Sequence, residues 1–238
     1  MRQYKAALVG YGGMGRWHYQ GICKTDRVKM IGVYDINPQR MALAKEDGME
    51  KTYASYEELL ADGEIDIVVV ATPNNFHLPL VCQAMEAGKA VICEKPVAMS
   101  SEELQIMMDT SARTGRLFTI HQNRRVDADY ILMRQTVEQG LLGDVFEIES
   151  RVTGSRGIPE GWRQYEVAGG GMMLDWGVHL IDQLVMMYAD KPVVSIQCDM
   201  YHVAYKECDD GFRLLMKFQN GPTAMVEAVS YTHLRAHE

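Results

Sequence analysis

Two side chains four residues apart, Asp175 and His179, have the types and the spacing of a general-base pair. They fall in a segment expected to be helical, 174–187, so both side chains are predicted to lie on one helix face. A carboxylate beside an imidazole orients the ring and favours its protonated form. The ring then suits removal of the hydroxyl proton from an alcohol whose carbon loses a hydride. The competing interpretation is that His179 is a satisfied histidine of the core.

A glycine pattern near the start of the chain points to a nucleotide. Gly10, Gly12 and Gly15 form G-x-G-x-x-G directly after an apolar strand and before a predicted helix. Glycines at these positions permit a tight turn, a close approach of the backbone to a pyrophosphate and close helix packing. The helix that starts there turns its free N–H groups towards the phosphates. The predicted cofactor loop therefore consists of Gly10, Gly12, Gly13, Met14 and Gly15, and the alternative is a plain turn.

Asp35 follows the second predicted strand, 20 residues after Gly15. An acid at this place accepts hydrogen bonds from the adenosine ribose and repels a 2′-phosphate, which favours NAD over NADP. Two alternatives stay open. Asp35 could merely cap the helix that begins near Pro38, and Arg40 could still reach the 2′-phosphate of NADP.

The elements around these residues change in kind about halfway along the chain. Up to residue 122, strands and helices alternate, which predicts right-handed crossovers and a doubly wound parallel sheet, an α/β Rossmann domain at 1–122. The expected strands are 5–9, 28–34, 67–71, 90–93 and 117–120, and the expected helices are 13–24, 38–47, 79–87 and 101–114, the last ending at Gly115. A further short helix is expected after Ser55, which forms a capping box with Glu58 three residues on. Residues 123–229 predict an α+β substrate and oligomerisation domain with a mainly antiparallel open sheet, from helices at 128–139 and 174–187 and strands at 145–152, 193–200, 212–218 and 223–230.

Two further motifs carry a resemblance to a known family. One is Glu94-Lys95-Pro96 after a strand, preceded by Ala71-Thr72-Pro73 and His77; the other is Gly169-Gly170-Gly171, followed by Asp175, Gly177, His179 and Asp182. Together they resemble the Gfo/Idh/MocA oxidoreductases, which include glucose–fructose oxidoreductase and inositol 2-dehydrogenase. The resemblance runs from about residue 4 to about residue 229.

The resemblance implies catalytic roles for Lys95, Asp175 and His179. His179 is expected to be the base, Asp175 its orienter and Lys95 the group that binds the substrate hydroxyl and stabilises the developing alkoxide. An exchange of roles between Lys95 and His179 stays open, as does a merely solvated loop lysine at position 95. Asp182 is as consistent with a helix-surface acid as with a part in catalysis.

The same resemblance places other residues near the cofactor or the substrate. Thr72, Pro73, Asn74 and His77 are expected on the nicotinamide side, although His77 fits a packing role equally well. Glu94 is expected either to serve structure or to contact the nicotinamide ribose, and the Lys95–Pro96 bond to be cis. Sugar or polyol hydroxyls are expected to meet Asn123, Arg124, Arg125, Trp162 and Arg163, of which the last two fit subunit contacts as well.

Composition narrows the partners and the compartment. The net charge is −8 with no long basic block, which argues against nucleic acid as a partner. No apolar run reaches the roughly 18 residues of a membrane span. The five cysteines are odd in number and form no Cys-x-x-Cys pair. We therefore expect reduced thiols in a cytoplasmic protein, no metal site, and a homo-oligomer in the full-length parent.

The last residues, 230–238, break the strand alternation, and we predict a non-native tail there. His233 and His237 are therefore not expected to be ligands. Members of the family continue further and complete the open sheet, so the chain is predicted to be truncated at its C-terminal end, which leaves a sheet edge exposed.

These expectations combine into one predicted function. It is an NAD(P)-dependent dehydrogenase that moves a hydride between a nicotinamide cofactor and a CH–OH carbon of a sugar or polyol such as an inositol. Two alternatives remain: an NAD-dependent glycosidase on the same scaffold, and a non-catalytic sensor that binds dinucleotide.

Overall fold

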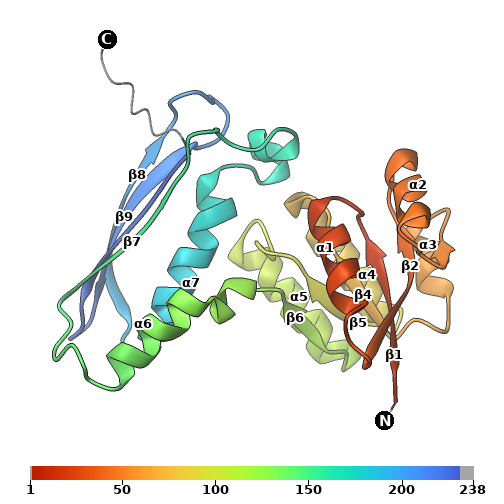
Figure 1. The fold of residues 1–238 in the computed structure, drawn as a ribbon, viewed down its shortest axis with the longest axis horizontal. Coiled ribbons are helices and arrows are strands. Elements are labelled where there is room, and N and C mark those ends of the chain that lie inside the picture. Colours follow the sequence, from red (N-terminus) through yellow and green to blue (C-terminus); the bar gives the residue numbers. More distant parts are fainter. Residues whose placement is uncertain (1, 231–238) are drawn as a thin grey trace. The chain divides into compact units, whose positions relative to one another are not determined.

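The computed structural model describes residues 2–230. Of the predicted tail at 230–238, residues 231–238 therefore lie outside the described residues, and Ser230 is described. The chain forms two compact units, and the boundary between them falls between His121 and Gln122. Figure 1 shows the elements of both.

The first unit is built on a parallel sheet of six strands in the order β3-β2-β1-β4-β5-β6. The order reverses between β1 and β4, as in doubly wound sheets. The strands are β1 (Tyr4–Val9), β2 (Val28–Tyr34), β3 (Lys51–Thr52), β4 (Ile67–Val70), β5 (Ala90–Cys93) and β6 (Phe118–Ile120). The helices are α1 (Gly13–Ile22), α2 (Pro38–Glu46), α3 (Tyr56–Ala61), α4 (His77–Glu86) and α5 (Ser101–Thr114), with a short 3₁₀ turn at Asn74–Phe76.

Helices cover this sheet on both faces. One core joins Val68 and Val70 of β4 to α3, α4 and α5, and a separate core joins Val69 of the same strand to α1 and α2. Because neighbouring residues of a strand point to opposite faces, a strand between two cores must be apolar throughout. The sequence Ile-Val-Val-Val of β4 meets that requirement.

Local signals set the ends of several helices as the sequence predicts. The Ser55 hydroxyl accepts the Glu58 N–H at 3.2 Å, and the Glu58 carboxylate accepts the Ala54 N–H at 2.6 Å, which closes a reciprocal cap at the start of α3. At its far end, α5 stops at Gly115, whose φ is +65°. Glycine adopts this left-handed conformation without a Cβ penalty.

The second unit packs a helix against one face of a mixed sheet. It contains 3₁₀ turns at Asn123–Val126, Trp162–Gln164 and Glu166–Ala168, helix α6 (Ala128–Glu138), strands β7 (Glu147–Thr153), β8 (Val193–Tyr201), β9 (Gly211–Phe218) and β10 (Thr223–Val229), a π-helical segment at Met173–Gly177, and helix α7 (Val178–Met187). The strand order is β7-β10-β9-β8. β8 and β10 pair antiparallel to β9, and β10 pairs parallel to β7.

The core of this unit lies between α7 and that sheet. Leu180 and Leu184 of α7 pack with alternate residues of β9, which are Phe212, Leu214, Met216 and Phe218. The residues between them in β9, Arg213, Leu215 and Lys217, are exposed. The predicted, mainly antiparallel sheet is confirmed, with the parallel pairing of β7 and β10 as an addition that the sequence did not indicate.

The helix expected at 174–187 differs in its first turn. Residues Met173–Gly177 are π-helical, and the α-helix starts only at Val178. Asp175 and His179 therefore stand on different kinds of helical turn rather than on one continuous α-helix. Insertions of this kind alter the rotation between successive side chains and are frequent at functional sites.

Two further observations concern the described part of the chain. None of its helices combines the length and the apolar character that crossing a bilayer requires. The five cysteines are free thiols, of which Cys93 and Cys208 are buried.

Candidate active site

The loop between β1 and α1 packs so tightly that two of its positions admit only glycine. A Cβ added to Gly10, whose φ is +90°, would lie 2.5 Å from the Ala71 carbonyl oxygen. A Cβ on Gly15 would lie 2.0 Å from the Gly10 oxygen. Over Gly13, by contrast, such an atom meets nothing within 4 Å among the described residues. The loop is thus closed against its own backbone and that of Ala71 on one side and open on the other, which fits the approach of a pyrophosphate.

The start of α1 is suited to an anion. Gly12 precedes the helix, and within residues 2–230 no side chain caps it. The first turn includes the N–H groups of Gly13 and Met14, which have no acceptor within the helix itself. Such groups, together with the positive end of the helix dipole, attract phosphate.

Asp35 ties the glycine loop to the end of β2. Its Oδ2 accepts the Tyr11 N–H at 2.7 Å and its Oδ1 accepts the Asn37 N–H at 2.8 Å. The residue is 8% exposed. The carboxylate is therefore fixed in place beside the loop, where a ribose hydroxyl can add a further hydrogen bond.

Asn37, and not Asp35, caps the helix that follows. The Asn37 side-chain oxygen accepts the Gln39 N–H at 2.8 Å, directly before Pro38. The interpretation of Asp35 as the cap of this helix is therefore wrong. Arg40 lies 3.5 Å from Asp35 and partly balances its charge, and an open hollow beside them is lined by Ile36, Asn37, Pro38 and Gln39.

Thr72, Pro73, Asn74 and His77 follow β4 at the carboxyl edge of the sheet. His77 is fully buried, and its ring nitrogens face two carbonyl oxygens, Pro96 at 2.9 Å and Thr72 at 3.1 Å. Burial lowers the pKa of His77 and favours the neutral ring. His77 thereby connects the segment after β4 to the segment after β5.

The segment after β5 presents Glu94, Lys95 and Pro96. The Lys95–Pro96 peptide is cis, as the sequence analysis expects. The Lys95 N–H donates to Glu94 Oε2 at 3.2 Å, so the carboxylate holds the backbone at the lysine. The Lys95 side chain is half-buried.

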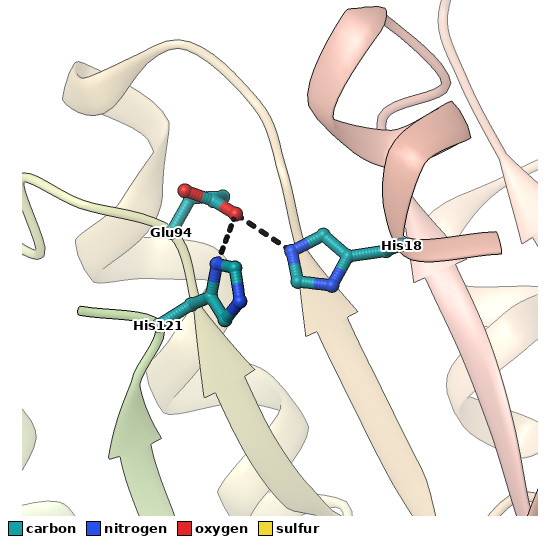
Figure 2. Close-up of side chains that lie close together, drawn as sticks. All are labelled: His18, Glu94 and His121. Atoms are coloured by element: carbon teal, nitrogen blue, oxygen red, sulfur yellow. Dashed lines mark hydrogen bonds and ion pairs between the residues drawn. The ribbon is translucent and has the colours of Figure 1, made fainter. Parts of the chain in front are cut away.

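Glu94 also joins two histidines that the sequence analysis did not single out. Glu94 Oε1 lies 2.6 Å from His18 Nε2 and 2.9 Å from His121 Nδ1 (Figure 2). Burial by itself would raise the pKa of Glu94, but the hydrogen bonds and charges of His121 and His18 outweigh it and lower that pKa to about 2. Glu94 is therefore an ionised carboxylate at neutral pH although only 5% of it is exposed. We call His18, Glu94 and His121 the His–Glu–His cluster.

In the second unit, His179 is held by Gln122. His179 is 4% exposed, and its Nδ1 lies 2.8 Å from Gln122 Oε1. The Gln122 amide nitrogen donates to the Val178 carbonyl oxygen at 3.0 Å, which fixes the orientation of the amide. Because an amide oxygen only accepts, Nδ1 carries the proton and the lone pair of the neutral ring is on Nε2.

Asp175 has a basic neighbour. Its Oδ1 lies 3.4 Å from Arg163 Nε, and the Arg163 guanidinium lies over the Trp162 ring at 4.4 Å. The two residues of the Trp162–Gln164 turn expected at the substrate therefore stack on one another. Gly171, four residues before Asp175, packs so tightly that a Cβ there would come within 2.2 Å of Asp209 Oδ1.

The turn Asn123–Val126 contains Arg124 and Arg125, two of the residues expected to bind substrate hydroxyls. Arg124 lies over the Trp176 ring at 4.2 Å and pairs with Asp127 at 2.9 Å. Arg125 forms two parallel contacts with Asp182, at 2.7 and 2.5 Å. The ion pair with Arg125 gives Asp182 a partner in its own unit. This agrees with the expectation that Asp182 is an acid on the surface of the helix.

The three predicted catalytic residues are divided between the units. Lys95 belongs to the first unit, and Asp175 and His179 belong to the second. Within the second unit, Asp175 and His179 follow one another along the π-helical segment and the start of α7.

Two family descriptions match the chain. The oxidoreductase family with an NAD-binding Rossmann fold matches residues 4–122, and the GFO/IDH/MocA C-terminal domain matches residues 130–237. The chain belongs to the Gfo/Idh/MocA family.

Individual Gfo/Idh/MocA relatives agree with these matches. An uncharacterized oxidoreductase of Schizosaccharomyces pombe is 34% identical over 71% of this chain and 46% of its own length. D-glucoside 3-dehydrogenase of Escherichia coli is 29% identical over 83% of this chain and 57% of its own length. The chain thus spans about half the length of these curated relatives. Among solved structures, an NAD-binding protein from Listeria innocua superposes with a TM-score of 0.95 and 43% identity, over 98% of this chain and 69% of that one.

The matches to both family descriptions confirm the predicted family, and the superposition with the Listeria innocua structure confirms the predicted fold class.

The sequence analysis missed His18, His121 and Gln122. His121 directly follows β6 and Glu94 directly follows the neighbouring β5, so their common position at the carboxyl edge of the sheet was a usable signal. His18 and Gln122 offered no such signal in the sequence. Their partners, Glu94 and His179, are 76 and 57 residues away.

Proposed function

We propose that the chain contains the cofactor domain, 1–122, and residues of the substrate domain, 123–229, of an NAD-dependent dehydrogenase. The reaction would transfer a hydride between nicotinamide and a hydroxyl-bearing carbon of a sugar or polyol. Family membership and the shape of the glycine loop support the cofactor. The relative named D-glucoside 3-dehydrogenase supports a sugar as the class of substrate.

The observation that carries the catalytic part of this proposal is the hydrogen bond between His179 and Gln122. It gives a buried imidazole one orientation and one neutral tautomer. In that tautomer, Nε2 is the nitrogen that can accept a proton. A base must be held in this way if it is to take a hydroxyl proton as the hydride leaves the neighbouring carbon.

The residues of the chain then have separate tasks. Bound NAD would supply the hydride acceptor. His179 Nε2 takes the hydroxyl proton, and the Lys95 ammonium group donates a hydrogen bond to the same oxygen while negative charge develops there. Gln122 provides an orienting contact at His179 Nδ1, beside the orienting role proposed for Asp175. Asp175 contributes negative charge that stabilises the protonated ring.

The preference for NAD over NADP rests on Asp35. Its carboxylate is held by two backbone N–H groups beside the glycine loop. A 2′-phosphate at that place would meet a fixed negative charge, and Arg40, with half of its side chain exposed, balances that charge only in part. We expect Asp35→Asn to narrow the difference in affinity between NAD and NADP, measured by calorimetry.

Cofactor binding is tested on the chain itself, and turnover on a protein that covers the full length of the curated relatives. Formation of NADH is followed over a panel of inositols and sugars. We expect His179→Gln to lower kcat by about 10²–10⁴-fold while NAD binding is retained. The matched control is His202→Gln, which removes an exposed histidine of the same unit and should leave kcat unchanged.

Other outcomes would select the alternatives. Release of a leaving group without net NADH would indicate a glycosidase that uses its NAD transiently. NAD binding with no chemistry on any substrate, unaffected by Lys95→Ala, would indicate a dinucleotide sensor and would contradict the dehydrogenase.

A further inference from the structure

Three side chains from separate elements of the first unit direct their ligand atoms towards one point. His18 comes from α1, Glu94 follows β5 and His121 follows β6 (Figure 2). One atom from each, His18 Nε2, Glu94 Oε1 and His121 Nδ1, lies within 4.8 Å of both others. We propose that the His–Glu–His cluster binds a divalent transition-metal ion, with Zn²⁺ as the best match. The proposal is independent of the dehydrogenase reaction.

The chemistry of the donors selects the class of ion. Two imidazole nitrogens and one carboxylate oxygen form a ligand set that Zn²⁺ uses with a water molecule in the fourth position. Co²⁺ and Ni²⁺ accept the same donors, whereas Mg²⁺ and Ca²⁺ prefer sites made of oxygen alone. The sequence analysis expected no metal because it considered cysteine patterns, and this cluster contains no cysteine.

The distances are compatible with an ion after a small adjustment. Tetrahedral Zn²⁺ holds nitrogen and oxygen ligands at about 2.0–2.2 Å, which places ligand atoms about 3.3 Å from one another. The two contacts to Glu94 Oε1 are 2.6 and 2.9 Å. Side-chain rotations that lengthen these two distances by less than about 1 Å bring both pairs to this spacing, and the third pair, His18 Nε2 and His121 Nδ1, lies within 4.8 Å.

The residues around the cluster limit the movement of its side chains and leave one of them, His121, accessible to an ion. His18 and Glu94 are 6% and 5% exposed, whereas 22% of the His121 side chain remains accessible. The Trp17 ring packs against both imidazoles, with centroids 5.5 Å from His18 and 5.3 Å from His121. Glu94 Oε2 is held by the Lys95 N–H at 3.2 Å. Supporting contacts of this kind orient the ligands of a metal site.

The competing explanation is that the cluster is complete without an ion. In that case the two histidines donate to one carboxylate oxygen, and the cluster only joins α1 to the segments that follow β5 and β6. The two explanations differ in a measurable quantity, the affinity for a transition metal that depends on all three side chains.

The first experiment titrates the metal-free chain with Co²⁺ and follows its visible absorption, and then adds Zn²⁺ as a competitor. The protein carries His233→Gln and His237→Gln, so that the histidines near its end do not bind metal. We expect one ion per chain, a spectrum typical of four-coordinate Co²⁺, and displacement by Zn²⁺. His18→Gln and His121→Gln should each weaken binding by about tenfold or more, whereas His202→Gln, which removes an exposed histidine, should not.

Two results would overturn the proposal. One is the absence of stoichiometric Co²⁺ or Zn²⁺ binding. The other is binding that is insensitive to both cluster variants, which would indicate surface histidines. If a cluster variant fails to fold, by circular dichroism, the decision falls to unaltered crystals soaked in Zn²⁺ and measured at the zinc absorption edge. An anomalous peak between the three side chains supports the site, and its absence there contradicts it.

Discussion

The two sheets of this chain bury their strands in different ways. In β4 of the first unit, the neighbours Val68 and Val69 are both fully buried, each in a different core. In β9 of the second unit, Leu214 is 4% exposed and its neighbour Leu215 is 43% exposed. Helices cover both faces of the first sheet, whereas α7 covers one face of the second. The number of covered faces therefore decides whether successive residues of a strand are equivalent.

The most sensitive test of this comparison lies in β9. Leu214→Ala should reduce the free energy of unfolding by about 2–5 kcal/mol, because it leaves a cavity in the core against α7. Leu215→Ala removes the same atoms from the exposed face and should cost less than about 1 kcal/mol. Both values come from urea unfolding of the two variants and the parent. Equal losses would contradict the assignment of one buried face.

The corresponding pair in β4 should behave differently. Val68→Ala and Val69→Ala each delete two buried methyl groups, and each should cost about 2 kcal/mol. The expected ratio of the two losses is close to one, in contrast to the pair in β9. If one of the two variants lost less than half as much free energy of unfolding as the other, one face of the first sheet would be poorly packed.

The smallest effect concerns two aspartates, one in each unit. The Asp62 carboxylate accepts from Lys51 Nζ at 2.7 Å, and this hydrogen bond is the main cause that lowers its pKa from 3.8 to about 2. Asp209 is 6% exposed, and burial raises its pKa despite the N–H that it accepts from Met173 at 2.8 Å. Their contributions to stability should therefore change with pH in opposite directions.

The sign follows from the state that folding favours. Asp62 stabilises the folded chain above pH 3.8, and this contribution is lost as the pH falls towards 2. Asp209 favours folding in its neutral form, so its contribution is present below the ordinary pKa and is lost as the pH rises through the raised value. The measurement compares unfolding free energies of Asp62→Asn and Asp209→Asn with the parent across acidic pH. The Asp62 effect should stay below about 1 kcal/mol, since the Lys51–Asp62 pair is near the surface. Differences that change in the same direction for both variants would be inconsistent with these environments.

Much of the first unit could be predicted from the sequence because its signals are local. The strands Val28–Tyr34 and Ala90–Cys93 and the helix Ser101–Thr114 have the predicted bounds. The two-residue strand β3 is too short to have a periodicity and was missed. In the site, the glycine loop was predictable because part of its constraint is local: Gly10 has a φ of +90°, and a Cβ on Gly15 would lie 2.0 Å from the Gly10 oxygen.

The sequence by itself determined the order of strands and helices, the tight turn at Gly10–Gly15 and the cap at Ser55, since these depend on residues close together in the chain. Only the tertiary structure decided that Glu94 meets His18 and His121, that Gln122 orients His179, and that β7 pairs parallel with β10. These contacts join residues between 27 and 76 positions apart. Which of many polar side chains meet at such separations depends on how packed elements bring the ends of different strands together, and no local pattern of residues encodes that arrangement.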